Sequence, residues 1–376
     1  MKRLLWIARI LVGVLFIFSG LIKANDPLGL SYKMQEFFEV WGWTFLNDYT
    51  LAFSVLMIAF EIIAGVAVLV GWQMNLFSWL LLLLILFFTF LTGYALFSGQ
   101  IKECGCFGNC IPLKAGQSFV KDLVLLVLIC FIFSQRRKIT STLPSKISIL
   151  TLAVSGIGSF GFMYYTLNYL PVIDCLPYKV GVNILGGMKI PAGAKPDSTV
   201  ITFVYQHNQQ ELEFTADQFP SDFNDSTYMF VRRYDKLIRP GNALPAIKDF
   251  MLINQRGEPS TERSLDAEGY KLFLFIKSDY PKGIWMEKAD LLGREAAKRG
   301  IARIMVTSIP LEELYKAAPP VFYRFEPYQC DVVAVKTAAR TNPCLYLLNK
   351  DTILNKWSYQ ELDQALLRIQ NLVKLY

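Results

Sequence analysis

The chain has 376 residues, of which 53% are hydrophobic and 18% are charged, and its mean hydropathy is +0.34. This composition excludes an ordinary soluble protein, because soluble domains carry more charge and fewer apolar residues. The net charge of +7 comes without a run of Lys or Arg, which argues against nucleic acid as a partner, and the single histidine, His207, excludes metal centres built on histidine pairs.

Five apolar runs come before residue 171, and a helix needs about 20 apolar residues to cross about 30 Å of hydrocarbon. The runs cover residues 4–22, 51–71, 76–97, 118–134 and 147–169. The first follows Lys2 and Arg3 and has no small-residue cleavage site after it, so we expect a retained span. The sequence after residue 171 has the charges and turns of a globular protein. We therefore predict a membrane half surrounded by lipid, followed by a soluble half.

Basic residues predict the orientation of these spans. They gather before or within the first span and between the fourth and fifth: Lys2, Arg3, Arg9, Arg136, Arg137, Lys138 and Lys146. Loops rich in Lys and Arg stay on the cytoplasmic side. We therefore expect a bacterial inner-membrane protein with a cytoplasmic N-terminus and with loops 23–50 and 98–117 and the C-terminal half in the periplasm. That compartment permits disulfides.

Two ionisable residues lie inside predicted spans, where charge is costly and often functional. Glu61 is in the second span and Arg9 in the first. One interpretation is a structural contact between Arg9 and Glu61; the other is a carboxylate that handles protons or binds a headgroup. Just outside the membrane, segment 37–43 contains Trp41 and Trp43 and predicts an interfacial helix.

The loop between the third and fourth spans contains three cysteines within seven residues, Cys104, Cys106 and Cys110. They could form a redox-active pair, staple the loop, or bind metal. Three thiolates without a fourth ligand or a nearby histidine make metal the weakest of these, and we predict none. Gly105 and Gly108 allow the tight turns that bring sulfurs together.

A Cys104–Cys106 disulfide would close a small, strained ring, and strained bonds exchange more readily. Cys106–Cys110 is the relaxed alternative, and Cys175, just after the fifth span, could also reach the loop. A reactive thiolate would be favoured by a cation such as Lys102 or by a helix N-terminus. Cys130 lies inside the fourth span, where we expect it to pack as a small apolar side chain.

Several of these residues form familiar motifs. Arg9, Gly13, the run Phe18-Ser19-Gly20-Leu21-Ile22-Lys23 and Asp26-Pro27 resemble the first helix and its exit in the DoxX-like family, and Glu61 with Gly65 and Gly71 resembles its second helix. Cys104-Gly105-Cys106-Phe107-Gly108 is similar to the methylamine-utilisation MauE branch.

This resemblance covers residues 1–138 and implies a four-helix membrane bundle. The bundle is related in architecture to quinone-linked disulfide-forming proteins, so a quinone is the cofactor that the analogy implies. MauE-like proteins are associated with a thioredoxin-like partner and with disulfide formation in a periplasmic client. The present chain adds Cys110, a fifth span over 139–170 and a large tail.

The tail predicts two regions. Residues 171–261 are expected to be a small β-rich region, with strands at 199–205, 212–215 and 228–231. Residues 262–376 alternate strands and helices in the order of a thioredoxin fold. We expect strands at 271–276, 302–307, 344–348 and 353–357 and helices at 286–298, 311–317 and 359–375.

Pro343 stands where thioredoxin-like proteins carry a cis-proline, and we predict a cis bond there. The turn 278–285 would carry the redox pair of that fold, but it contains no cysteine. The domain is therefore predicted to bind rather than to exchange disulfides. Cys344 begins a buried strand and is expected in the core, whereas the polar surroundings of Cys330 indicate exposure.

Two functional hypotheses follow. The first is an inner-membrane protein of thiol–disulfide exchange, a candidate oxidoreductase that forms or relays disulfides to a periplasmic client or a thioredoxin-like protein. The second is a non-enzymatic membrane scaffold or assembly factor whose loop cysteines form a structural disulfide.

Overall fold

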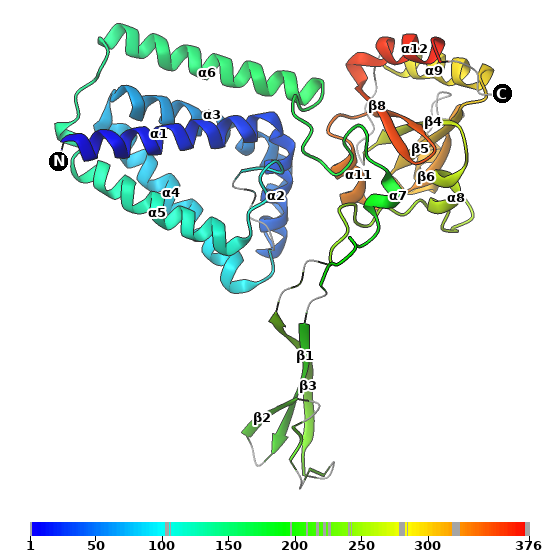
Figure 1. Ribbon diagram of the computed structural model, residues 1–376, viewed down its shortest axis with the longest axis horizontal. Helices are drawn as coiled ribbons and strands as arrows, with labels where there is room; N and C mark the ends of the chain where they lie inside the picture. Colours follow the sequence, from blue (N-terminus) through cyan, green and yellow to red (C-terminus); the bar gives the residue numbers. More distant parts are fainter. Residues whose placement is uncertain are drawn as a thin grey trace.

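The computed structural model describes residues 2–101, 105, 107–195, 198–207, 210–215, 218–220, 223–224, 227–239, 241, 243–277, 283, 285–317 and 324–372. Within them the chain forms an N-terminal helical bundle, a three-stranded arm, and a mixed sheet with helices on both faces (Figure 1). This arrangement confirms the fold class expected from the sequence.

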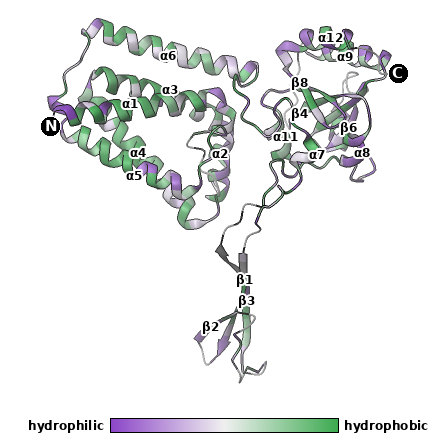
Figure 2. Ribbon diagram, in the orientation of Figure 1, coloured by the Kyte–Doolittle hydropathy of each residue, from purple (hydrophilic) through white to green (hydrophobic). Residues whose placement is uncertain are grey.

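The bundle contains five long helices: α1 (Lys2–Asn25), α3 (Thr50–Val70), α4 (Met74–Ser98), α5 (Ala115–Ser134) and α6 (Ser145–Asn168). Each is long and apolar enough to cross a membrane. All five expose large apolar side chains, as at Leu11, Leu56, Leu83, Val127 and Ile157, and hydrophobic residues run along them in Figure 2. Lipid covers such a surface and water does not. The chain is therefore a multi-pass membrane protein.

Helices α1 and α3 approach each other closely because two glycines face one another. A Cβ atom on Gly13 would lie 2.9 Å from the carbonyl oxygen of Gly65, and one on Gly65 would lie 2.8 Å from that of Gly13. Small residues at such contacts let membrane helices pack backbone against backbone. This contact places the polar side chains of α1 and α3 within reach of each other.

The two ends of the bundle differ in composition. At one end the loop before α6 meets the end of α3, where the Thr142 amide donates to the Val70 carbonyl (2.9 Å). The loop also contains η2 (Arg136–Lys138). At the other end lie α2 (Pro27–Val40), η1 (Thr44–Tyr49) and the loop 99–114 between α4 and α5, which we call the cysteine loop. The C-terminal half follows from this second end (Figure 1).

Helix α2 is longer than the interfacial segment predicted at 37–43. It begins at Pro27, a favoured first residue of helices, and Asp26 caps it by accepting from the Gly29 amide (3.0 Å). It ends at Val40, so Trp41 and Trp43 follow the helix rather than lie in it. The cap signal of Asp26-Pro27 was in the sequence, and it marks the true start.

The arm is an antiparallel sheet in the order β2-β1-β3, with β1 (Ser198–His207), β2 (Gln210–Thr215) and β3 (Met229–Arg239). All three expected strands exist, and β3 extends eight residues beyond the predicted end at 231. A three-stranded sheet needs an apolar face to be stable. Here aromatic rings supply it: Phe203, Tyr205, Phe214, Phe219, Phe223 and Phe230.

The C-terminal sheet has the order β6-β5-β4-β7-β8. Its strands are β4 (Tyr270–Ile276), β5 (Ala302–Thr307), β6 (Glu326–Gln329), β7 (Cys344–Asn349) and β8 (Thr352–Ser358). Strands β4, β5 and β6 are parallel, whereas β7 and β8 run antiparallel to their neighbours. A parallel βαβ unit followed by an antiparallel hairpin and a helix is the expected thioredoxin-like arrangement.

Helices cover both faces of this sheet. Helices α9 (Trp285–Lys298) and α12 (Leu362–Gln370) pack on one face, and α11 (Val332–Ala338), α8 (Thr261–Asp266) and α7 (Ile184–Gly187) lie on the other. Helix α10 (Leu311–Ala317) follows β5. The predicted helix 359–375 begins as the 3₁₀ helix η4 (Tyr359–Glu361) and continues as α12, which ends at Gln370; residues 373–375 lie outside the described residues. Strand β6 and helix α11 were not predicted.

The Asn342–Pro343 bond is cis, which confirms the prediction. The side-chain oxygen of Asn342 accepts from the amide of Lys277, at the end of β4 (3.1 Å). The proline therefore lies beside the end of β4, as expected. Most of the turn that should follow β4 lies outside the described residues.

Candidate functional site

The cysteine loop is tied covalently to the segment after α6. Cys110 forms a disulfide with Cys175, and their Cα atoms are 4.8 Å apart. This bond confirms that Cys175 reaches the loop and contradicts the Cys106–Cys110 alternative. The sequence did not indicate which loop cysteine Cys175 binds, because the partners are 65 residues apart and only the fold brings them together. Cys104 and Cys106 lie outside the described residues, so the predicted bond between them stays a prediction.

The residues that flank Cys106 pack on the end of the bundle. Gly105 and Gly108 have φ angles of 67° and 55°, the left-handed turns for which glycine was expected. The Phe107 ring lies 6.0 Å from that of Phe18 on α1, and the Lys121 ammonium on α5 lies 5.1 Å from it. The loop therefore lies across α1 and α5, with a cation beside it.

Glu61 pairs with a residue that the sequence did not single out. Its carboxylate forms a buried ion pair with Lys23 and accepts from Ser19 (3.3 Å). The predicted contact with Arg9 is wrong, because Arg9 donates to the carbonyls of Val68 and Leu69 at the end of α3 (3.0 and 2.9 Å).

The helix lengths explain this error. Arg9 and Lys23 are 14 residues apart, about 21 Å along α1, and only Lys23 is within reach of Glu61. Arg9 instead satisfies carbonyls that the last turn of α3 leaves without helical donors. Lys23 also lies 4.8 Å from the Phe88 ring. Removing one member of a buried ion pair leaves an uncompensated charge, which destabilises the folded protein by about 3–5 kcal/mol.

A second intramembrane carboxylate was missed. Asp122 on α5 is fully buried, accepts from the Thr92 hydroxyl (3.0 Å) and pairs with Lys121 (2.6 Å). The signal was the pair Lys121-Asp122, two neighbouring charges inside an apolar run. Asp122 thereby holds the cation that lies over Phe107.

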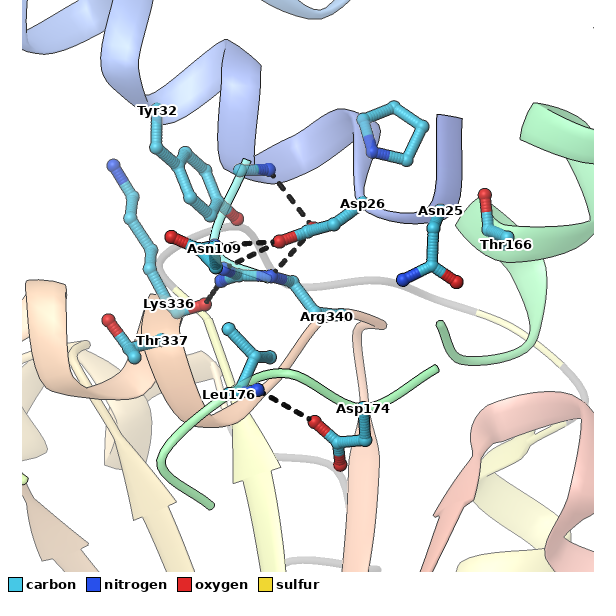
Figure 3. Close-up of polar contacts among 12 residues, drawn as sticks. Asn25, Asp26, Tyr32, Asn109, Thr166, Asp174, Leu176, Lys336, Thr337 and Arg340 are labelled. Atoms are coloured by element: carbon cyan, nitrogen blue, oxygen red, sulfur yellow. Dashed lines mark hydrogen bonds and ion pairs between the residues drawn. The ribbon is translucent and has the colours of Figure 1, made fainter. Parts of the chain in front are cut away.

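The junction between the bundle and the C-terminal sheet is built around Asp26 (Figure 3). Asp26 Oδ2 accepts from the side-chain amide of Asn109, in the cysteine loop (2.9 Å), and from Arg340 Nη2 (3.0 Å). Arg340 Nε lies 2.8 Å from Asp26 Oδ1 without hydrogen-bond alignment. Both charged side chains are buried, at 9% and 5% exposure.

The neighbouring Asn25 binds the segment that contains Cys175. Its side chain donates to the Ile173 carbonyl (2.8 Å) and accepts from the Ile173 amide (3.0 Å). Asp174 then pairs with Lys356 of β8 (2.6 Å). Asn25 and Asp26 together therefore hold the loop that contains Cys110 and the segment that contains Cys175.

One edge of the C-terminal domain, which we call the docking edge, contains Lys277, Lys336, Arg340, Asn342 and Pro343, and its charged side chains meet α2. Its three cations surround the Tyr32 ring of α2, at 5.9, 5.1 and 5.5 Å for Lys277, Lys336 and Arg340. Lys336 also donates to the Gln35 side chain (3.2 Å). Cations over a ring attract it electrostatically. The edge that would hold the active site of a thioredoxin thus faces the membrane bundle.

The remaining cysteines are poorly suited to exchange. Cys344 is fully buried, as predicted, and burial raises the pKa of its thiol to about 11. Cys330 was expected to be exposed, but it is 5% exposed, and burial raises its pKa to about 12. The prediction failed because Cys330 joins β6 to α11, which were not foreseen. Cys130 is exposed on the surface of α5 rather than packed.

No group of three or more His, Cys, Asp or Glu residues that could hold a metal is present within the described ranges.

Residues 1–135 match the family model of the methylamine utilisation protein MauE. Residues 1–135, which contain α1 to α5, are a MauE-family domain. Residues 199–240, which include the arm, match a domain of unknown function, DUF8463. Protein TlpB of Flavobacterium psychrophilum is 28% identical over 131 residues, which are 33% of this chain and 35% of that protein. The chain thus spans about a third of the length of this curated relative. No solved structure matches the chain.

We expect Cys330 and Cys344 to resist alkylation in the folded protein at pH 8, because a thiol with a raised pKa is scarcely ionised and both are buried. Their ordinary pKa is 9.0, so the unfolded chain loses these protons first as the pH rises. The stability of the domain should therefore fall between about pH 9 and 11.

The measurement is iodoacetamide labelling followed by peptide mass spectrometry, with the exposed Asn371→Cys variant as the reactive control. Rapid labelling of Cys330 or Cys344 at pH 8, at the rate of residue 371, would contradict the buried assignment.

Proposed function

We propose that this protein exchanges thiols and disulfides at the outer face of the bacterial inner membrane, with Cys104 and Cys106 as its redox pair. The observation that carries the proposal is the Cys110–Cys175 disulfide, which fixes the MauE-type cysteine loop at the junction of bundle and tail. The MauE match supports a link to disulfide chemistry, since the family resemblance implies a role in disulfide formation.

The proposed reaction has two steps, oxidation of the client by the loop disulfide and reoxidation of the loop. A thiolate of a periplasmic client attacks the Cys104–Cys106 disulfide, and resolution leaves the client oxidised and the loop as a dithiol. Two electrons and two protons must then leave the loop to restore its disulfide. A membrane quinone is the class of acceptor that the bundle architecture suggests, and it would leave as the quinol.

The thioredoxin-like domain is proposed to bind rather than to react. It has no cysteine between β4 and α9, and its two thiols are buried in the core. Its docking edge lies against α2, next to Asp26 and the cysteine loop. Such a domain can position the loop or a client without taking part in electron transfer.

A second candidate is a scaffold or assembly factor with structural cysteines. The observation that favours it is the same disulfide, because Cys110–Cys175 joins two segments that Asn25 and Asp26 already hold. In that case Cys104 and Cys106 would have no role in exchange. The two candidates differ in what a loop variant does in the cell.

The proposed orientation has a direct test. The basic residues of the N-terminus and of loop 136–146 lie at the bundle end opposite α2 and the tail, which supports a periplasmic tail. An alkaline phosphatase fusion after Tyr376 should be active, and one after Lys138 should be silent. The reverse pattern would place the cysteine loop in the cytoplasm and overturn the proposal.

The Cys106→Ala variant has no loop disulfide, so its Cys104 thiolate should attack the disulfide of an oxidised client, the reverse of the proposed step, and the mixed disulfide should persist because Cys106 is absent to resolve it. Cys110 already binds Cys175 and Cys330 is buried, so we expect the adduct to contain a periplasmic protein. Non-reducing electrophoresis with mass spectrometry detects it, and Cys130→Ala is the control. If no adduct forms and the double Cys104→Ala, Cys106→Ala variant behaves normally in every assay in which deletion has a phenotype, the scaffold candidate replaces this one.

We propose that Glu61 carries protons during reoxidation of the loop. Glu61→Gln should lower the level of folded protein, because the buried Lys23 loses its counter-charge and the fold is destabilised by about 3–5 kcal/mol. Adding Lys23→Met should restore that level, because neither charge then remains buried.

Under this proposal the restored double variant re-forms the loop disulfide at least about a hundredfold more slowly after mild reduction, the lower end of the usual range for a lost proton-transfer group. The rate is measured by quenched alkylation in isolated membranes. A double variant that reoxidises at the normal rate would show that Glu61 is structural.

A further inference from the structure

A cavity of about 900 Å³ lies in the C-terminal domain, at the end of the sheet where the parallel strands begin. Lys271 near the start of β4, Ala302 at the start of β5 and Glu326 at the start of β6 line it. The docking edge is at the opposite end, since Lys277 follows the last residue of β4. The length of β4 therefore separates the two by roughly 20 Å. The cavity is a site distinct from the junction with α2.

The described part of the cavity wall is strongly basic. Arg324 is neutralised by Asp290, which is not among the described lining residues (2.8 Å). Arg256 and Arg263, by contrast, form no ion pair or side-chain hydrogen bond within the part of the chain that the structure describes. Their charge is therefore available to a ligand. The described charged side chains of the wall are five cations and two carboxylates: Arg256, Arg263, Lys271, Arg303, Arg324, Glu258 and Glu326.

Lys271 adds a buried charge to the same wall. Its side chain is 1% exposed, and its ammonium donates to the carbonyls of Leu265 and Lys350. An ammonium has three donors, and only these two have partners among the described residues. Burial lowers the pKa of Lys271 despite three nearby carboxylates. A buried cation without a paired counter-charge is costly, so an anion in the cavity would stabilise it.

The edge of the sheet limits how a ligand can bind. Strand β6 is the outer strand, but Pro327 has no amide hydrogen, and Gln329 already pairs with Ile253 (2.8 and 2.9 Å). Addition of a further strand is therefore blocked, and a ligand has to be recognised through its side chains.

The distribution of charge around the cavity indicates the kind of anion. The cations come from separate segments, namely the turn 254–258, α8 and the starts of β4 and β5, and Glu258 and Glu326 lie among them. Two glutamates repel a compact, highly charged group such as phosphate. Several separate carboxylates, each beside its own cation, match this arrangement better.

We propose that this cavity binds an acidic segment of a partner protein, whose carboxylates pair with Arg256, Arg263 and Lys271. Arginine binds carboxylates through two parallel hydrogen bonds, and the volume suits a short stretch of chain. Helix α8, which contains Arg263, lies on the side of the domain away from the bundle (Figure 1), so a partner reaches it without meeting the membrane helices. The inference concerns binding alone and is independent of which candidate function is correct.

The test measures, by fluorescence anisotropy, how a labelled peptide of alternating glutamate and serine binds the full-length protein in neutral detergent. A peptide with glutamine in place of glutamate is the matched ligand. The variants are Arg256→Gln, Arg263→Gln and Glu326→Gln. Both arginines are exposed, so we expect normal folding. Arg368→Gln is the control, because Arg368 is exposed on α12 and is not among the lining residues, yet its loss changes the net charge equally.

The glutamate peptide should bind saturably, and the glutamine peptide at least about tenfold more weakly, because several ion pairs are lost together. Arg256→Gln and Arg263→Gln should each weaken binding about fivefold, as for an ion pair that stays partly exposed. Glu326→Gln should tighten binding, because a like charge is removed. Arg368→Gln should match the parent protein.

Inorganic phosphate and citrate serve as competitors at equal ionic strength. Citrate should displace the peptide more readily than phosphate does, because it offers separate carboxylates, but should bind more weakly than the peptide. If phosphate is the better competitor, the cavity is a phosphate site and the proposal fails. If citrate binds more tightly than the peptide, the ligand is a free carboxylate and the proposal fails as well.

Two further results would overturn the proposal. One is the absence of saturable binding of the glutamate peptide. The other is a loss of binding in Arg368→Gln as large as that in Arg263→Gln, which would show attraction by net charge alone. Should Arg263→Gln change the circular dichroism spectrum, Arg263→Lys takes its place with a smaller expected loss, since lysine keeps the charge but lacks the fork geometry.

Discussion

The arrangement of this protein depends on a buried carboxylate at the exit of its first helix. Asp26 caps α2, holds the cysteine loop through Asn109 and binds Arg340 of the C-terminal domain. A buried charge is tolerated only when it is paired and hydrogen-bonded. The Asp26 carboxylate therefore needs Arg340 as its counter-charge and Asn109 and the Gly29 amide as hydrogen-bond donors. The disulfide beside it adds a covalent link between the same loop and the start of the tail.

The same constraint acts deeper in the bundle. Glu61 and Asp122 are both buried, and each has a lysine and a hydroxyl as partners. Charge inside a membrane is expensive even when paired, and replacing such pairs with apolar residues is often neutral or stabilising. Stability alone therefore does not explain why the bundle contains two buried, paired carboxylates. Lys121 links one of them to the cysteine loop through the Phe107 ring.

Much of the fold was predictable because it follows from local patterns. Apolar length identified the five spans, and alternation and turn residues identified the strands β1, β4, β5 and β7. The short strand β6 and helix α11 were not predictable in this way, because a four-residue strand between two loops has little periodicity of its own. Because β6 and α11 were not predicted, Cys330, which lies between them, was wrongly expected to be exposed.

The candidate site was only partly predictable, since it depends on contacts between distant segments. The sequence indicated Glu61, the cysteine loop and the cis-proline. It gave no sign that Lys23 rather than Arg9 reaches Glu61, and it indicated that Cys175 could reach the loop without showing that Cys110 is its partner. The Asp26–Arg340 contact joins residues 314 positions apart. Such a pair is fixed by the way a whole domain packs, which no local pattern records.

We propose that Cys104 and Cys106 cycle between dithiol and disulfide while the Cys110–Cys175 bond stays oxidised. Differential alkylation of living cells, followed by mass spectrometry of both cysteine pairs, tests this directly. We expect a mixture of dithiol and disulfide at Cys104 and Cys106 that shifts toward the disulfide when the supply of terminal electron acceptor rises, with Cys110 and Cys175 oxidised throughout. If Cys104 and Cys106 are fully oxidised under every growth condition, they do not exchange and the loop is a structural staple.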